Sequence, residues 1–102
     1  MIVEYTRYQV ADEQRSALER AYERAQSVLI TSPHCLSYEL SRCLEEPTSY
    51  ILRIEWDSAD GHLKGFRGSP QFQTFFEAVR PFFKAIQEMR HYELTRVTGK
   101  RE

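Results

Sequence analysis

The sequence predicts one α+β domain whose elements follow the order β-α-β-β-α-β. The chain has 102 residues, which is the size of a single compact domain. Apolar residues make up 41% and aromatic residues 13%, so the chain has enough apolar surface for a core and is not disordered. Its apolar residues alternate in some segments and recur every three or four residues in others, which indicates strands separated by helices.

The first third of the chain predicts a strand followed by a helix. Residues 2–9 alternate and are rich in β-branched and aromatic types, which is typical of a strand. Asp12 has a side chain of the capping type, so we expect a helix from Asp12 to about Ser32, where the following Pro33 disfavours helical geometry. One face of this helix is apolar and consists of Leu18, Ala21, Tyr22, Ala25, Val28 and Leu29.

The next segment predicts a β-hairpin. Residues 35–43 and 50–56 form its two strands, and the turn-forming stretch between them is short. One side of the first strand carries Leu36, Tyr38 and Leu40. One side of the second strand carries Tyr50, Leu52, Ile54 and Trp56, and the other side carries Ile51, Arg53 and Glu55.

The second helix is predicted to be broken. Its first piece opens at Asp57-Ser58, and glycines weaken it before Ser69; its apolar stripe is Ala59, His62, Leu63 and Phe66. Ser69 as the cap and Pro70 at the first helical position predict the start of the second piece. The apolar residues of this piece recur at helical spacing and are Phe72, Phe75, Phe76 and Val79. Pro81 interrupts the pattern, and a further turn or two follows.

The last strand completes the predicted architecture. Residues 88–97 alternate as a strand, and we expect residues 98–102 to be a frayed tail. The whole is the ferredoxin-like split βαβ arrangement, in which both helices cover one face of an antiparallel sheet. The domain spans residues 1–97.

The face of the sheet away from the helices is predicted to be an interface. We expect it to carry Ile2, Glu4, Thr6, Tyr8, Ser37, Glu39, Ile51, Arg53, Glu55, His91 and Glu93. A surface that mixes apolar groups with complementary charges is suited to self-association. Two such sheets stacked about a two-fold axis bury it on both partners, so the sequence predicts a homodimer through the open sheet face.

Charge and composition exclude several partners and compartments. The formal net charge is −1 and the basic residues form no cluster, so we expect no nucleic-acid partner. No stretch approaches a membrane span, and the N-terminal segment lacks the pattern of a signal peptide, so we expect a cytoplasmic protein. Cys35 and Cys43 lie eight residues apart on one predicted strand, which is too far for a disulfide.

Three segments of the chain resemble a known family. They are Tyr50-Ile51-Leu52-Arg53-Ile54-Glu55-Trp56, the helix start Ser69-Pro70-Gln71-Phe72 with the Phe75-Phe76 pair, and Glu88-Met89-Arg90-His91-Tyr92-Glu93. With them, residues 2–95 resemble the antibiotic biosynthesis monooxygenase (ABM) domain family of dimeric α+β barrels. The resemblance implies one pocket per subunit, between sheet and helices. It also implies oxygenation of a small aromatic compound of phenol or quinol type without metal, flavin or haem.

Some relatives in that family bind and degrade haem, and the sequence argues against this activity here. Those relatives use an Asn on the first strand, with a Trp and a His on the helical side. This sequence has no asparagine, and it has Phe66 and Phe76 near the places of the helical Trp and His. We therefore expect no cofactor.

The candidate site is an aromatic pocket with one proton acceptor. The predicted pocket residues are Tyr5, Trp56, Phe66, Phe72 and Phe76, with Arg67 at the mouth for an acidic group of the ligand. His62 lies on an apolar stripe and is the candidate catalytic base, because a neutral imidazole accepts a phenolic proton. His91 is expected on the open face with Glu93 and with Arg53 or Glu55, where it forms a structural His–Glu pair in the dimer interface; a catalytic role is the second interpretation.

Two other functions are compatible with the same sequence. One is a non-catalytic module for ligand binding or stress response that keeps the fold without turnover. The other is an isomerase or decarboxylase of the same barrel type. The sequence contains no Ser/His/Asp signature, no phosphate-binding glycine pattern and no carboxylate cluster suited to a metal.

Overall fold

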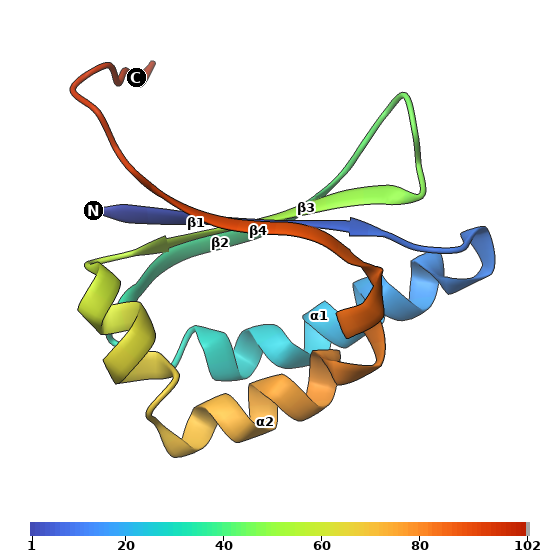
Figure 1. The fold of residues 1–102 in the computed structure, drawn as a ribbon, viewed down its shortest axis with the longest axis horizontal. Coiled ribbons are helices and arrows are strands. Elements are labelled where there is room, and N and C mark those ends of the chain that lie inside the picture. The colour runs from blue at the N-terminus through green and yellow to red at the C-terminus, as the bar shows by residue number, and fades with distance from the viewer. Residues whose placement is uncertain (102) are drawn as a thin grey trace.

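A computed structural model describes residues 1–101, and its elements follow the predicted order (Figure 1). The four strands are β1 (Ile2–Gln9), β2 (Cys35–Arg42), β3 (Ser49–Trp56) and β4 (Ile86–Glu93). The two α-helices are α1 (Arg15–Leu29) and α2 (Pro70–Val79). Three short helical segments join them: η1 (Asp12–Gln14), η2 (Gly61–Phe66) and η3 (Arg80–Ala85).

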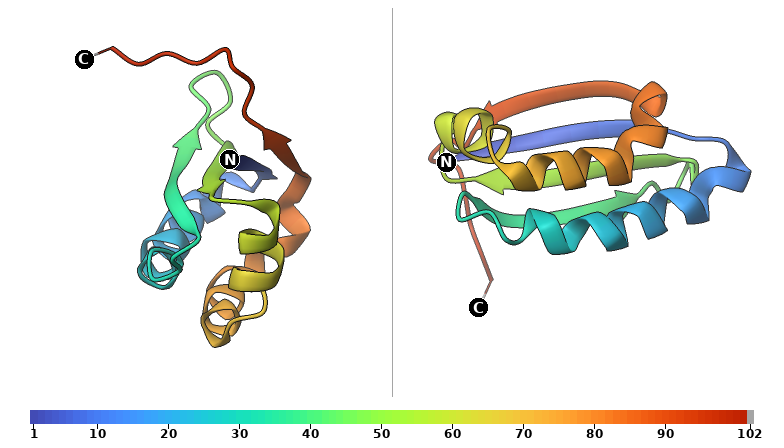
Figure 2. Two further views of the ribbon diagram at one scale, coloured as in Figure 1. Left: turned by 90° about the vertical axis from the view of Figure 1, so that its left-hand side faces the viewer. Right: turned by 90° about the horizontal axis from the view of Figure 1, so that it is seen from below.

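The sheet is antiparallel with strand order β2-β3-β1-β4, so β1 and β3 are its central strands. Both α-helices and η2 lie on one face, as the view from below in Figure 2 shows. The ribbon on the opposite side of the sheet consists of the β2–β3 loop and the C-terminal segment (Figure 1). The predicted ferredoxin-like α+β architecture is therefore confirmed.

The core lies between α1 and the strands β1 and β3. Trp56 and Leu18 are fully buried, and Tyr8 and Tyr50 are nearly so. The predicted apolar face of α1 is buried except for Val28, which is half-buried near the end of the helix. Burial of such side chains stabilises the fold by roughly 1.5–3 kcal/mol each.

Several predicted boundaries are wrong by a few residues. Asp12 begins a 3₁₀ turn and does not cap α1; its carboxylate pairs with Arg15 at 3.1 Å. The helix ends at Leu29, before the predicted Ser32. Ser69 does precede α2, but its hydroxyl donates to the carbonyl of Phe66.

The last strand is also shifted toward the N-terminus of the chain. It runs from Ile86 to Glu93, whereas residues 88–97 were expected. The cause is its partner: β4 pairs with β1, and Glu93 lies opposite Ile2, where β1 begins. Beyond Glu93 one backbone hydrogen bond follows, from the amide of Leu94 to the carbonyl of Met1 at 3.2 Å, and β1 has no further residue to pair with. Residues 94–101 therefore belong to no helix or strand, and Glu102 of the predicted tail lies outside the described residues.

The predicted open face is correct for β2 and β3 but wrong for β1 and β4. Ile51, Arg53 and Glu55 do face away from the helices, together with Ser37 and Glu39. The β1 residues that share this face are Val3, Tyr5 and Arg7, because they pair with Glu55, Arg53 and Ile51. The expected residues Ile2, Glu4, Thr6, Tyr8, His91 and Glu93 lie on the helix side of the sheet.

No helix within residues 1–101 has the length and the apolar character that crossing a membrane requires.

Candidate functional site

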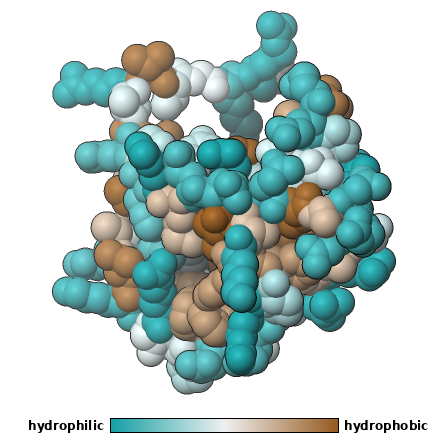
Figure 3. Space-filling view, turned by 45° about the vertical axis from the view of Figure 1, so that its right-hand side comes forward, coloured by the Kyte–Doolittle hydropathy of each residue, from teal (hydrophilic) through white to brown (hydrophobic). Residues whose placement is uncertain are grey.

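A cavity lies between the sheet and the helical segments η2, α2 and η3. Its volume is about 80 Å³, and its walls come from three strands, α1, η2, α2 and η3. Five phenylalanines contribute to the wall: Phe66, Phe72, Phe75, Phe76 and Phe83. Figure 3 shows apolar side chains reaching the surface in the middle of the molecule, where hydrophilic side chains frame them. Phe83 is 42% exposed, so the cavity has an aromatic residue that reaches solvent.

The aromatic rings form a continuous packed set around Phe66. Its ring centroid lies 5.3 Å from that of Trp56, and it makes edge-on contacts with Phe72 at 5.6 Å and Phe75 at 5.5 Å. Phe72 packs in turn on Phe76. Such a wall offers π-faces and edges and few hydrogen-bonding groups, which suits a flat, apolar ligand.

Glu4 places a carboxyl group in this otherwise apolar wall. It lies on the central strand β1 and is only 5% exposed. Its Oε1 accepts a hydrogen bond from Trp56 Nε1 at 3.0 Å, and its Oε2 accepts one from Thr6 Oγ1 at 3.3 Å. Because burying a carboxyl group without partners is unfavourable, these two donors fix its position.

The segment that carries His62 is a π-helix. The amide of Arg67 donates to the carbonyl of His62 at 3.1 Å, which closes a turn five residues long. Gly61 and Gly65 leave room for the ring of His34: a Cβ on Gly65 would lie 2.6 Å from His34 Nε2. His34 Nδ1 lies 2.9 Å from Asp57 Oδ2, so this ring is held where it supports the π-helix. Single π-turns are frequent at functional sites.

The His62 ring is buried beside the Glu4 carboxyl group. The residue is 4% exposed, and its Nε2 lies 3.4 Å from Glu4 Oε1. Its ring centroid lies 4.4 Å from that of Trp56 and 4.9 Å from that of His91. Among the residues that the structure describes, neither ring nitrogen has a hydrogen-bond partner. Burial, assisted by the charges of Arg67 and His91, lowers the pKa of His62 to about 4, so the imidazole is neutral near pH 7.

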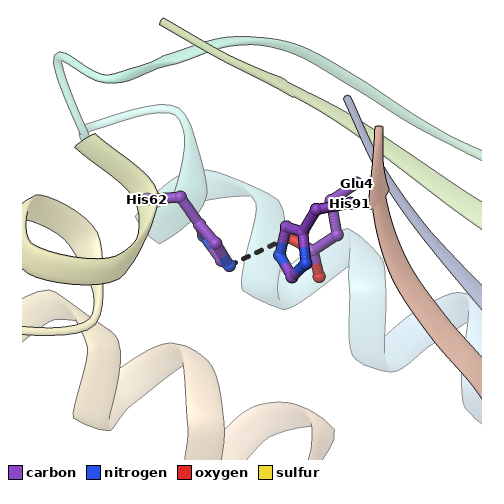
Figure 4. Close-up of side chains that lie close together, drawn as sticks. All are labelled: Glu4, His62 and His91. Atoms are coloured by element: carbon purple, nitrogen blue, oxygen red, sulfur yellow. Dashed lines mark ion pairs between the residues drawn. The ribbon is translucent and has the colours of Figure 1, made fainter. Parts of the chain in front are cut away.

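The His91 side chain extends from β4 toward Glu4 and His62. The residue lies directly opposite Glu4 in the β1–β4 pair, and its side chain is exposed. The functional atoms of Glu4, His62 and His91 all lie within 4.8 Å of one another (Figure 4). His91 does share a face with Glu93, but the expected placement beside Arg53 or Glu55 is wrong: those two pair with each other at 2.7 Å on the opposite face. This group of one carboxyl and two imidazole side chains is not a carboxylate cluster, and the sequence analysis did not identify it.

A second polar pair lies elsewhere in the cavity wall. The hydroxyl groups of Tyr8 and Tyr22 are hydrogen-bonded to each other. Burial raises the pKa of both hydroxyls. The pair therefore stays protonated over the physiological pH range and offers a neutral hydrogen-bonding group in an apolar wall.

Most of the predicted site residues lie around the cavity. His62, Trp56, Phe66, Arg67, Phe72 and Phe76 line it. Tyr5 does not: it lies on the opposite face of the sheet, where its ring packs edge-on against Tyr92 at a centroid distance of 5.5 Å. On β1, sequence reasoning missed the lining residues Glu4, Thr6 and Tyr8, because this strand was assigned the wrong face. One signal in the sequence could have indicated a site here: Glu4 is a carboxylate inside a strand of β-forming residues.

Comparisons with known proteins agree with one another. The family model described as "Antibiotic biosynthesis monooxygenase" matches residues 1–78. The Bacillus subtilis (strain 168) protein YczJ, which is uncharacterized, is 28% identical over 75 residues, or 74% of this chain and 79% of that protein.

Solved structures of similar proteins share the fold. A Bordetella bronchiseptica protein, described as a proposed antibiotic biosynthesis monooxygenase, is 24% identical with a TM-score of 0.74; the match covers 92% of this chain and 96% of that one. SnoaB from Streptomyces nogalater, described as a cofactor-independent oxygenase, is 16% identical with a TM-score of 0.74; the match covers 99% of this chain and 97% of that one.

Proposed function

The chain belongs to the antibiotic biosynthesis monooxygenase family, and from this premise we propose that it oxygenates a small aromatic compound of phenol or quinol type bound in the cavity. The observation that carries the proposal is the His62 ring, whose buried nitrogens have no partner among the described residues and lie in the wall of an aromatic cavity. The monooxygenase names of structural neighbours support it.

The proposed reaction balances without a prosthetic group. In an anthrone-like phenol, a ring CH₂ group next to the phenol or its keto form becomes C=O; in a hydroquinone, a ring C–H becomes C–OH while the ring is oxidised to the quinone. One atom of O₂ stays in the product and the other leaves as water, and the substrate supplies all four electrons. The description of SnoaB as a cofactor-independent oxygenase supports this form of the reaction.

His62 acts as the proton acceptor. Its Nε2 takes the proton of the bound substrate and leaves an electron-rich anion that transfers an electron to O₂. The neutral form of His62 is available for this step because its pKa is lowered to about 4. The Glu4 carboxyl group, 3.4 Å from Nε2, then lies beside the positive charge that forms on the imidazole.

The remaining walls orient the substrate and exclude water. Trp56, Phe66, Phe72 and Phe76 hold the ring system between aromatic faces, and Arg67 faces an anionic oxygen of the ligand. The Tyr8–Tyr22 pair supplies a hydrogen bond to a further oxygen of the substrate. A cavity of about 80 Å³ favours a small substrate, and larger ones require the exposed Phe83 side chain to move.

A ligand-binding module without turnover is the second candidate. The low basicity of His62 favours it, because a base with a pKa of about 4 removes a phenolic proton poorly. Oxygen uptake with a panel of hydroquinones and anthrone-like phenols separates the two functions. Uptake that His62→Ala abolishes supports the oxygenase, and saturable binding without uptake supports the module. Leu63→Ala is the matched control, since Leu63 follows His62 on the π-helix and is 49% exposed.

We further propose that the protein acts as a homodimer through the open face of the sheet. This face carries the exposed side chains of Tyr5, Ile51 and Tyr92. The Arg53–Glu55 ion pair lies among them. Apolar groups between paired charges are suited to burial against a second copy of the same surface.

A further inference from the structure

We propose that Glu4, His62 and His91 form a binding site for a divalent first-row transition metal ion. The inference goes beyond the proposed oxygenation and stands independently of it. Two imidazole nitrogens and one carboxylate oxygen are a donor set that zinc, iron, cobalt and nickel ions accept. The three ligands come from three elements, β1, η2 and β4, and the fold brings their side chains to one place (Figure 4).

The backbone determines this convergence. Glu4 and His91 lie directly opposite each other on neighbouring antiparallel strands, so their side chains project from the same face about 5 Å apart at Cβ. The π-helix then brings the His62 ring over this pair from the helical layer. Side chains from rigid strands hold a coordination geometry better than side chains from loops do.

The distances fit a metal ion after a small adjustment. Two donors of one zinc ion, each about 2.1 Å from it, lie about 3.4 Å apart at the tetrahedral angle. His62 Nε2 and Glu4 Oε1 are 3.4 Å apart. The three donor atoms lie within 4.8 Å of one another, and His91 is exposed, so its ring has room to rotate toward the other two.

Among the described residues, the buried His62 ring has no hydrogen-bond partner, and the buried Glu4 carboxyl group is hydrogen-bonded but has no cationic partner. Within residues 1–101, both nitrogens of the His62 ring are buried without a hydrogen bond. Within the same residues, Glu4 Oε1 lies 3.4 Å from Nε2 of the His62 ring, which is neutral near pH 7, and no Lys or Arg lies within ion-pair distance of the Glu4 carboxyl group. Buried polar and charged groups are normally compensated. A bound cation would compensate both groups at once.

The surroundings also fit a metal centre with an open position. Trp56 Nε1 and Thr6 Oγ1 donate hydrogen bonds to Glu4 and so orient the carboxylate, which is the usual role of residues around metal ligands. Three protein ligands leave one position for water or a ligand from the cavity. A bound ion would occupy the lone pair of His62 and would therefore inhibit the oxygenation proposed above.

Titration of the EDTA-treated full chain with Co²⁺ tests the site directly, because tetrahedral Co²⁺ absorbs visible light. We expect one ion per chain at micromolar or tighter affinity, displacement by Zn²⁺, and a rise in melting temperature with either metal. His62→Ala and His91→Ala should each weaken binding tenfold or more. Glu4→Gln should do the same while keeping the acceptor for Trp56. Cys43→Ser, which removes a competing ligand type elsewhere, should leave binding unchanged.

Two results would overturn the inference. One is the absence of a Co²⁺ spectrum and of a thermal shift at millimolar metal. The other is unchanged affinity in His91→Ala, whose exposed position makes loss of folding no explanation. These measurements use no substrate, so they succeed or fail independently of oxygen uptake, which is measured in EDTA.

Discussion

His62 Nε2 lies 3.4 Å from Glu4 Oε1, and both side chains are almost completely buried. One comes from a π-helix and the other from the central strand β1, so this contact joins the helical layer to the middle of the sheet. It also places a neutral base and a carboxyl group at the wall of an aromatic cavity. The predictions below test this arrangement and its surroundings.

Trp56→Phe should destabilise the protein by about 2 kcal/mol. The substitution removes the Nε1–H that donates to Glu4 and leaves a buried carboxyl oxygen with one partner fewer, besides creating a small void. Urea unfolding followed by far-UV circular dichroism measures the change. A loss smaller than about 0.5 kcal/mol would contradict the role given to this hydrogen bond.

Stability of the metal-free protein should fall as the pH is lowered from about 6.5 to about 4. The unfolded chain protonates His62 near 6.5, whereas the folded chain resists protonation until about pH 4, so protons favour unfolding in this window. The contribution of this residue amounts to at most about 3 kcal/mol. Comparing the pH dependence of unfolding in EDTA with that of His62→Gln isolates it. Parallel curves for the two proteins would show that His62 titrates normally.

Gly65→Ala should destabilise the π-helix and the position of His62. A Cβ at this position would lie 2.6 Å from His34 Nε2, so the ring or the helix must move, at a cost of about 1–3 kcal/mol. Gly99→Ala is the control, because a Cβ there meets no atom within 4 Å. Thermal unfolding of both variants checks the prediction, and equal melting temperatures would contradict it.

The two cysteines should differ in reactivity. Burial raises the pKa of the Cys35 thiol to about 11, and the residue is 8% exposed, so little thiolate forms at pH 8. Cys43 is partly exposed. Mass spectrometry after brief treatment with iodoacetamide should find the label on Cys43 and not on Cys35. Labelling of Cys35 at a similar rate would show that this part of β2 opens readily.

Tyr92→Glu should convert the proposed dimer to monomer. It introduces a charge beside Tyr5 on the open face of the sheet. Ile30→Glu is the control, because Ile30 is 55% exposed and directly follows the last residue of α1, on the other side of the sheet. Sedimentation velocity at micromolar concentration distinguishes the states. A wild-type protein that sediments as a monomer would contradict the dimer itself.

The elements that the sequence predicted correctly carry their apolar residues mainly on one side. In α1 the apolar residues fall on one face, and in β3 all of them except Ile51 do, so only one orientation of each element buries its apolar side chains. In β1, Glu4 and Thr6 alternate with Val3 and Tyr5, and neither side is clearly apolar. Which side of β1 faces the helices depends on Trp56, because its Nε1–H donates to Glu4 and makes burial of that carboxyl group favourable. Trp56 is distant from Glu4 in the sequence, so the local pattern of β1 does not show this.

The candidate site could be predicted in its aromatic part but not in its polar part. The phenylalanine spacing of α2 indicated one wall of the cavity. The approach of His62 to Glu4 and His91 depends on a π-turn and on the register of β4, and local sequence patterns specify neither. Both arise from packing between segments far apart in the chain.

Turnover of an anthrone-like phenol under ¹⁸O₂ in the presence of EDTA is the most direct test of the proposed oxygenation. With the wild type and Leu63→Ala, the product should carry one ¹⁸O atom, and His62→Ala should lose at least 90% of the rate, about tenfold, as expected when a general base is removed. Saturable binding of the same phenol without ¹⁸O incorporation, or an unchanged rate in His62→Ala, would contradict the account.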